Sequence, residues 1–140
     1  MTRERCDEMS LTQTERSQLL QAAAKVAENA RAKYSDFRVG AAVLGDKGTY
    51  LGVNVENASY GLAICAERAA LAAAVTAGEK NIRAIAVACL DATTDETRMP
   101  CGACRQWILE LAPTAEVLIS GREKPLRIDE LLPQPFKAGA

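Results

Sequence analysis

Apolar and polar residues alternate along this chain in two rhythms, and each rhythm predicts one kind of element. The first apolar residues recur at three- and four-residue intervals, the spacing that forms one face of a helix. This helix is expected to start at Thr12, because Glu15 can complete a capping box with the Thr12 hydroxyl, and to end near Lys33. Its apolar face consists of Leu19, Leu20, Ala23, Val26, Ala27 and Ala30.

Beyond Phe37 the pattern becomes typical of strands. Residues 38–44 and 49–56 flank a turn at 45–48 that begins and ends with glycine, so they predict an antiparallel hairpin. The remaining elements expected are strands at 82–90 and 117–120, and helices at 65–77, from Pro100 onward and at 128–132.

This order of elements predicts a layered α/β domain around a mixed sheet, because helices join the later strands. The hairpin strands must be antiparallel, whereas the helix-linked strands are expected to be parallel, with right-handed crossovers. A chain of 140 residues suits a single domain over 1–140, in which residues 1–10 form a flexible arm.

The charge balance excludes several classes of partner. Seventeen Lys and Arg face eighteen Asp and Glu, a net charge of −1, which argues against binding a nucleic-acid polymer or an anionic membrane. The apolar runs are far shorter than the roughly 20 residues that a membrane span needs. Residues 1–10 mix both charges where a signal peptide would be apolar, so we expect a cytoplasmic protein.

Residue counts narrow the chemistry. The chain has no histidine, which excludes a Ser-His-Asp triad, a Cys-His pair and imidazole metal ligands. It has five cysteines, an odd number that disfavours a disulfide framework and favours a thiolate site.

Three of these cysteines stand at predicted helix starts. Cys101 and Cys104 follow Pro100 at a spacing that places both sulfurs on one helix face, and Cys65 opens the preceding helix. Three converging thiolates predict one zinc ion per chain with an open fourth position for a water nucleophile. Glu67 is the nearest proton acceptor in the sequence and is expected to point toward the neighbouring cavity, not to ligate the metal.

Two arginines follow these residues directly. Three thiolates and one zinc ion leave a net charge of −1, which would make a bound water a poor acid. Arg68 and Arg105 are therefore expected to donate hydrogen bonds to the sulfurs and withdraw negative charge from them.

The Cys-x-x-Cys segment alone would also suit a redox dithiol, and three cysteines could form a purely structural zinc site. The Cys-x-Glu segment, the proline before Cys101 and the lack of histidine favour catalytic zinc over the dithiol. A redox protein would keep its function after substitution of Glu67 and would form a reversible disulfide. A structural zinc domain would also keep its function after that substitution and would hold its zinc tightly.

At these residues the sequence closely resembles the small homotetrameric cytidine deaminases of pyrimidine salvage, which belong to the three-cysteine zinc-deaminase type. The resemblance extends from about Tyr34 to Phe136. It is carried by the segments YSDFRVGAA (34–42), NVENASYG (54–61), CAER (65–68), PCGACRQ (100–106) and LLPQPF (131–136).

The resemblance implies a three-layer α/β/α sandwich around a five-stranded mixed sheet. It also implies hydrolytic deamination of cytidine and 2′-deoxycytidine to uridine and 2′-deoxyuridine, with release of ammonia and Glu67 as proton shuttle. A sister zinc deaminase acting on another aminopyrimidine is the alternative within this class. Asn54 and Glu56, which lie two apart on a predicted strand and so share a face, favour a free nucleoside because both suit ribose hydroxyls.

The resemblance assigns the remaining pocket positions. Phe37 lines the pyrimidine pocket, the Ala66 N–H holds the base carbonyl, and Tyr60 is a further pocket residue. The carbonyl of Met99 or Pro100 accepts from the exocyclic amine. Phe136 enters the site of a neighbouring subunit, which implies composite sites in a homotetramer. Met99 and the polar segment 91–98 depart from the family pattern and leave the pocket size open.

Overall fold

The first helix begins where its capping residues predict. The structure, a computed structural model, describes residues 10–139, so the arm expected at 1–10 lies outside it except for Ser10. Helix α2 (Gln13–Ala27) follows Thr12, whose Oγ1 accepts from the Glu15 N–H at 3.1 Å while Glu15 Oε1 accepts from the Thr12 N–H at 3.0 Å. The capping box is therefore confirmed.

Helix α2 ends earlier than its apolar pattern predicts. It stops at Ala27 instead of near Lys33. The reason is tertiary: the Arg31 N–H donates to Asn54 O at 3.0 Å, and Arg31 O accepts from the Glu56 N–H at 2.9 Å. These bonds hold the segment after the helix alongside residues 54–56, where it cannot stay helical.

The sheet combines antiparallel and parallel pairs, as expected. Its strand order is β2-β1-β3-β4, and β1–β2 and β1–β3 are antiparallel whereas β3–β4 is parallel. Strands β2 and β3, which α3 connects, run in the same direction but are separated by β1. The strands are β1 (Val39–Gly45), β2 (Thr49–Val53), β3 (Ile82–Cys89) and β4 (Glu116–Ile119).

The expectation of five strands is wrong for the part of the chain that the structure describes, because the sheet there has four. Between β4 and residue 139 the β-pairing is limited to an isolated antiparallel bridge, in which Val117 and Leu126 exchange two hydrogen bonds of 2.8 Å. The ladder does not continue because the chain enters helix α5 at Ile128, two residues later.

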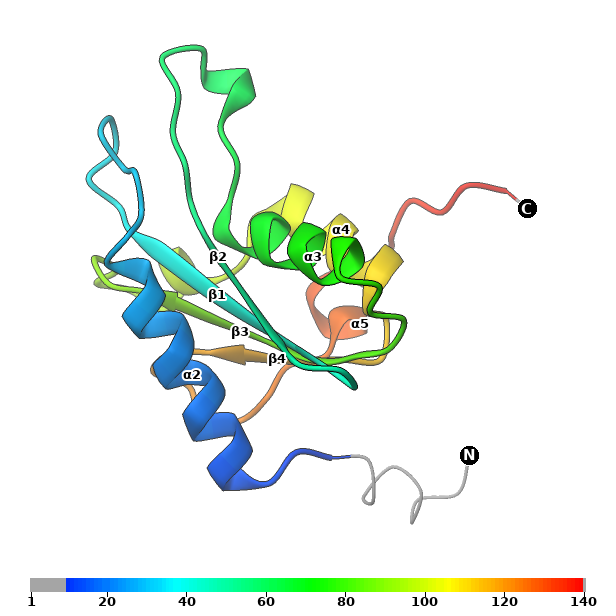
Figure 1. Cartoon of the computed structure of the whole chain (residues 1–140). Coiled ribbons are helices and arrows are strands. Elements are labelled where there is room, and N and C mark those ends of the chain that lie inside the picture. Colours follow the sequence, from blue (N-terminus) through cyan, green and yellow to red (C-terminus); the bar gives the residue numbers. More distant parts are fainter. Residues whose placement is uncertain (1–9, 140) are drawn as a thin grey trace.

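Helices cover both faces of the sheet, which gives the predicted three layers (Figure 1). Helix α2 packs on one face, and α3 (Ala66–Thr76), α4 (Gly102–Leu111) and α5 (Ile128–Leu131) lie on the other. Two short 3-10 turns, η1 (Tyr60–Leu62) and η2 (Glu96–Arg98), interrupt the loops. Among the described residues, no helix is both long and apolar enough to cross a bilayer.

The two faces of the sheet carry side chains of different size. The α3 side bears large aliphatic residues, whereas alanines dominate the α2 side, so that α2 lies close to the strands. The α3 side presents Val43, Ile85, Val87, Val117 and Ile119, and the α2 side presents Ala42, Ala84, Ala86, Ala88 and Leu118.

Close contact between β2 and α3 fixes the helix that carries part of the site. A side chain at Gly52 would meet the backbone of Ala66 and Ala70. We expect Gly52→Ala to lower the free energy of unfolding by about 1–3 kcal/mol, because α3 must shift to admit the methyl group. The midpoint of urea unfolding measures this. Gly48→Ala in the same hairpin is the matched control, since an added Cβ there approaches only the Tyr50 hydroxyl, at 3.9 Å. Equal midpoints for both variants would contradict the close packing.

Candidate metal centre

Three cysteines from distant parts of the sequence meet where α3 and α4 begin. Cys65 is the N-cap residue of α3, Cys101 is the N-cap residue of α4, and Cys104 lies in the first turn of α4. Their Sγ atoms all lie within 4.8 Å of one another. The Cys101 sulfur is 3.8 Å from that of Cys65 and 3.5 Å from that of Cys104. The fold therefore gathers the predicted ligands at one point.

The spacing of these sulfurs fits a zinc ion. Tetrahedral zinc with Zn–S bonds of about 2.3 Å holds its sulfur ligands about 3.8 Å apart. Both helix N-termini direct partial positive charge at the cluster, which favours thiolates. Three protein ligands leave a fourth coordination position, as in catalytic zinc sites.

The cluster already favours a thiolate at Cys65. The hydrogen bond from Cys104 is the largest reason why the pKa of Cys65 falls to about 5; burial opposes this shift, and the Arg68 guanidinium supports it. The pKa of Cys104 is raised, because its proton is held by Cys65 and because the side chain is buried. A zinc ion would displace that proton, because cysteine ligates zinc as the thiolate.

Glu67 lies beside the cluster in the first turn of α3 and is almost fully buried, with 5% of its surface exposed. Its Oε2 accepts from Cys104 Sγ at 3.6 Å. Burial raises the pKa of Glu67, as expected from desolvation, and the negative charge of Cys65 adds to the rise. A carboxyl group with a raised pKa can both accept and return a proton near neutral pH.

The two arginines make different contacts. Arg68 donates from its Nη2 to Cys65 Sγ at 3.3 Å, the contact that the sequence predicts. Its Nε is buried without a hydrogen-bond partner among the described residues. Arg105 instead donates from Nε to Pro100 O at 2.8 Å and from Nη1 to Leu131 O at 2.6 Å. It therefore ties the start of α4 to α5, and the predicted bond to sulfur is not among these contacts.

This difference predicts unequal effects on zinc binding. We expect Arg68→Gln to lower zinc affinity by about 10- to 100-fold, because the thiolate of Cys65 loses its charged donor. Competition with a chromogenic chelator measures the affinity. Arg105→Gln is the matched control and should change zinc affinity much less, since its partners are backbone carbonyls. Equal losses in the two variants would contradict the role given to Arg68.

Asn54 and Glu56 lie beyond the end of β2, not on the strand as expected, because β2 stops at Val53. The antiparallel bridge between Val55 and Ile64 carries both residues toward the cysteine cluster, since Cys65 follows Ile64. Asn54 is 9% exposed, and its amide is held by backbone: Oδ1 accepts from the Val39 N–H at 2.9 Å and Nδ2 donates to Phe37 O at 2.8 Å.

Glu56 lines a pocket of about 330 Å³ together with Tyr34, Ser35, Asn57, Tyr60 and Ala63. Hydrogen bonds from Ser35 and from the backbone of Tyr34 lower the pKa of Glu56, so it is a carboxylate at neutral pH. The pocket thus offers a fixed anion beside aromatic side chains, a combination that suits a polar ring bearing hydroxyl groups.

Two of the predicted pocket residues are largely exposed to solvent. Tyr60 is 76% exposed, and its ring meets that of Tyr34 edge-on with centroids 6.0 Å apart. Phe136 is also 76% exposed and lies on the C-terminal segment, which leaves the molecule beyond α4 (Figure 1). The Gln106 side chain anchors that segment by donating to Phe136 O at 2.8 Å.

Three other predicted residues lie within the fold. Ala66 is fully buried as the first residue of α3, and Phe37 is half-buried. Pro100 is buried, and its carbonyl already accepts from Arg105. Of the two carbonyls predicted to accept from an exocyclic amine, that of Met99 is therefore favoured, because the Pro100 carbonyl is bonded to Arg105.

Ser35 and Gln106 make specific bonds to predicted site residues, although neither has a role that was predicted from the sequence. A signal for Ser35 was present, because serine and aspartate both favour turns in which the side chain bonds the backbone two residues on. Gln106 had no local signal, since its partner lies thirty residues away.

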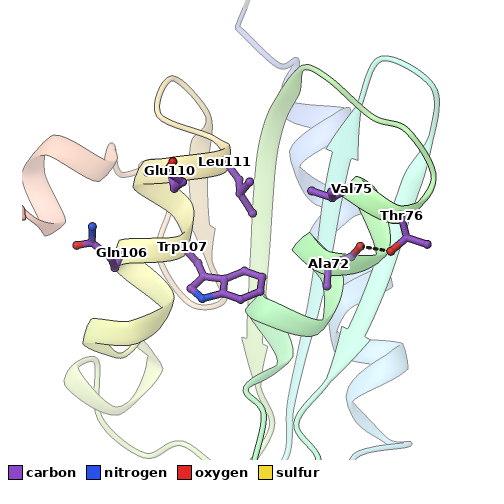
Figure 2. A pocket seen from close by; sticks show the side chains of 7 residues that line it. All are labelled: Ala72, Val75, Thr76, Gln106, Trp107, Glu110 and Leu111. Carbon is purple, nitrogen blue, oxygen red and sulfur yellow. Dashed lines mark hydrogen bonds between the residues drawn. The ribbon is translucent and has the colours of Figure 1, made fainter. Parts of the chain in front are cut away.

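A second hollow lies at the opposite ends of α3 and α4. Figure 2 shows the Trp107 ring reaching from α4 toward α3 in a groove of about 540 Å³. Its lining is Ala72, Val75, Thr76, Gln106, Trp107, Glu110 and Leu111, none of which is a cysteine ligand.

Comparisons with known proteins agree with this geometry. Residues 13–120 match the family described as "Cytidine and deoxycytidylate deaminase zinc-binding region", and that span contains all three clustered cysteines. The chain is 42% identical over 129 residues to cytidine deaminase from Halalkalibacterium halodurans, covering 89% of this chain and 96% of that protein.

Solved structures show the same similarity. Cytidine deaminase from Burkholderia pseudomallei superposes with a TM-score of 0.76 at 42% identity, covering 90% of this chain and 100% of that one. Cytidine deaminase from Mycobacterium tuberculosis also gives 0.76, at 37% identity, covering 87% of this chain and 97% of that one.

Proposed function

Because this chain belongs to the cytidine and deoxycytidylate deaminase family, we propose that it hydrolyses cytidine and 2′-deoxycytidine to uridine and 2′-deoxyuridine, releasing ammonia. It is a zinc-dependent hydrolase whose metal is held by the three-cysteine cluster. Cys65, Cys101 and Cys104 supply the thiolates, and Arg68 stabilises the charge on Cys65.

One observation carries the proposal: a buried carboxyl group stands beside the sulfur cluster, with Glu67 Oε2 3.6 Å from Cys104 Sγ. A structural zinc site has no use for such a group, and desolvating a carboxylate is costly. A hydrolytic deaminase needs it, because protons must pass from water to the ring and to the departing amine.

Zinc, when bound, lowers the pKa of a water ligand and so supplies a nucleophile near neutral pH. Glu67 takes a proton from the attacking water and delivers it to ring N3. Once the water oxygen is bonded to C4, Glu67 takes its second proton and transfers it to the exocyclic nitrogen. The C4–N bond then breaks, ammonia leaves, and the C4 carbonyl of the product forms. Its raised pKa suits both directions of transfer.

The backbone and aromatic residues around the cluster orient the base. We assign the Ala66 N–H to the base carbonyl and the ring of Phe37 to one wall of the pyrimidine pocket. The exocyclic amine donates to a carbonyl of the Met99–Pro100 segment, with Met99 favoured because Pro100 O bonds Arg105. Asn54 acts by fixing the backbone on either side of residue 38, so it positions Phe37.

The sugar lies in the pocket beside Glu56. The Glu56 carboxylate accepts a hydrogen bond from a ribose hydroxyl. Its fixed negative charge would repel a nucleotide phosphate, which favours a free nucleoside as substrate. The Tyr60 side chain lines the same pocket.

We extend the proposal to a homotetramer with composite sites, in which Phe136 enters the site of a neighbouring subunit. Its support is that Phe136 and Tyr60 are each 76% exposed, because burying aromatic side chains of this size at an interface is favourable. Sedimentation of the purified protein tests this, and a monomer at micromolar concentration would contradict it. Pyrimidine salvage in the cytoplasm stays a prediction from the sequence.

The experiment for the activity follows the fall in absorbance when purified protein is added to cytidine, with the product identified by chromatography. Zinc per chain is measured on the same sample. Uridine formation with about one zinc ion per chain is the expected result. Zinc without turnover would indicate another amine substrate or a structural metal. A metal-free protein with Cys101 and Cys104 oxidised would indicate a redox dithiol.

A further inference from the structure

A tight turn before β1 holds the carboxylate of Glu56 on three sides. The backbone N–H groups of Tyr34 and Ser35 donate to Glu56 Oε1 at 2.9 and 3.0 Å. The Ser35 hydroxyl donates to the other oxygen, Oε2, in a short hydrogen bond. Both carboxylate oxygens are therefore bonded to this turn.

The turn itself is rigid. Ser35 Oγ also accepts from the Phe37 N–H at 3.0 Å, and the Asp36 N–H donates to Ala32 O at 2.9 Å. Asp36 adopts a positive φ of 56°, which the side chain of an aspartate tolerates. Since the Glu56 N–H is bonded to Arg31 O at 2.9 Å, the glutamate and the turn form one unit.

These bonds leave little capacity on Glu56. A carboxylate offers about four acceptor positions, two on each oxygen. Two on Oε1 and one on Oε2 are filled by the turn, so a single position remains, on Oε2. Glu56 and Ser35 both line the 330 Å³ pocket.

We propose that Ser35 is a positioning residue that fixes Glu56 so that it accepts a single sugar hydroxyl of the nucleoside. This inference rests on the proposed function, in which Glu56 accepts a hydrogen bond from a sugar hydroxyl, and adds to it the residue that holds Glu56 in place. Nucleosides that lack one or the other vicinal hydroxyl therefore report on how well Glu56 is positioned.

The test compares cytidine, 2′-deoxycytidine and 3′-deoxycytidine with the wild-type chain and with Ser35→Ala. For the wild type, we expect kcat/KM for the two deoxynucleosides to differ by at least about tenfold, the value of one charge-assisted hydrogen bond. In Ser35→Ala, Oε2 gains a second free position and loses its orientation. We expect KM for cytidine to rise about tenfold with kcat nearly unchanged, and the tenfold preference to shrink.

Two variants serve as controls. Ser35→Thr keeps the hydroxyl and should restore KM and the preference, which a purely structural role would not require. Ser17→Ala, on the exposed surface of α2, should match the wild type. Equal kcat/KM for both deoxynucleosides in the wild type, or an unchanged KM in Ser35→Ala, would overturn this inference alone. A wild-type chain that leaves cytidine intact would overturn the proposed function and the inference with it.

Discussion

Replacing Glu67 by glutamine is expected to lower kcat for cytidine by about 10³-fold or more while zinc stays at about one ion per chain. Glutamine has nearly the same volume, so it fits the buried space beside Cys104. Its amide cannot accept the proton of the attacking water or return it to the ring. Steady-state kinetics and metal analysis on one preparation measure both quantities.

Glu110→Gln is the matched control for this variant. Glu110 lies on the exposed surface of α4, away from the cluster. Its replacement by glutamine removes one negative charge, as Glu67→Gln does. Its kcat should equal that of the wild type. A near-normal rate in Glu67→Gln with zinc retained would contradict the proposed mechanism and favour a structural metal.

The second large effect is expected from Cys101→Ser, which should lose most of its bound zinc and reduce deamination to background. Serine replaces a soft thiolate by a neutral hydroxyl that binds zinc poorly at neutral pH. The side chain at position 101 is exposed, so the fold should survive the change. Metal analysis after dialysis against a weak chelator measures the loss, and circular dichroism confirms that the protein stays folded.

Cys89→Ala provides the control, because this half-buried cysteine lies at the end of β3 and outside the cluster. Burial raises the pKa of its thiol to about 12, so it is not a thiolate at neutral pH. Zinc content and activity should be retained. Full zinc in Cys101→Ser would contradict the three-cysteine ligand set, and a reversible Cys101–Cys104 disulfide in an active wild type would favour redox chemistry.

The elements of the fold that could be predicted from the sequence are those whose signals are local. The Thr12–Glu15 capping box set the start of α2, and Gly78, with a φ of 87°, follows the end of α3 as expected. The end of α2 could not be predicted, because it depends on the bonds between Arg31 and residues 54–56. Within residues 10–139 the sheet has no fifth strand for a similar reason, since α5 begins too soon after Leu126.

The same distinction holds at the site. The cysteine cluster was predictable because two helix starts each carry their own short motif. Whether an arginine bonds sulfur or a carbonyl depends on what the fold places beside it, and Arg68 and Arg105 differ in this respect. Ser35 Oγ accepts from the Phe37 N–H and also donates to Glu56. The second bond could not be predicted, because the fold must first place Glu56, 21 residues away, against the turn.

The small side chains beneath α2 bear on how the molecule fluctuates. Detaching α2 uncovers a sheet face built mostly of alanines, together with Leu19 of the helix and Leu118 of β4. Detaching α3 or α4 exposes more large aliphatic side chains, among them Leu71 and Ile108. Partial opening should therefore begin at α2, and its amide hydrogens should exchange with solvent before those of β3 and α3. Such openings would leave the helices that bear the cysteines packed on their face of the sheet, so the site would stay assembled.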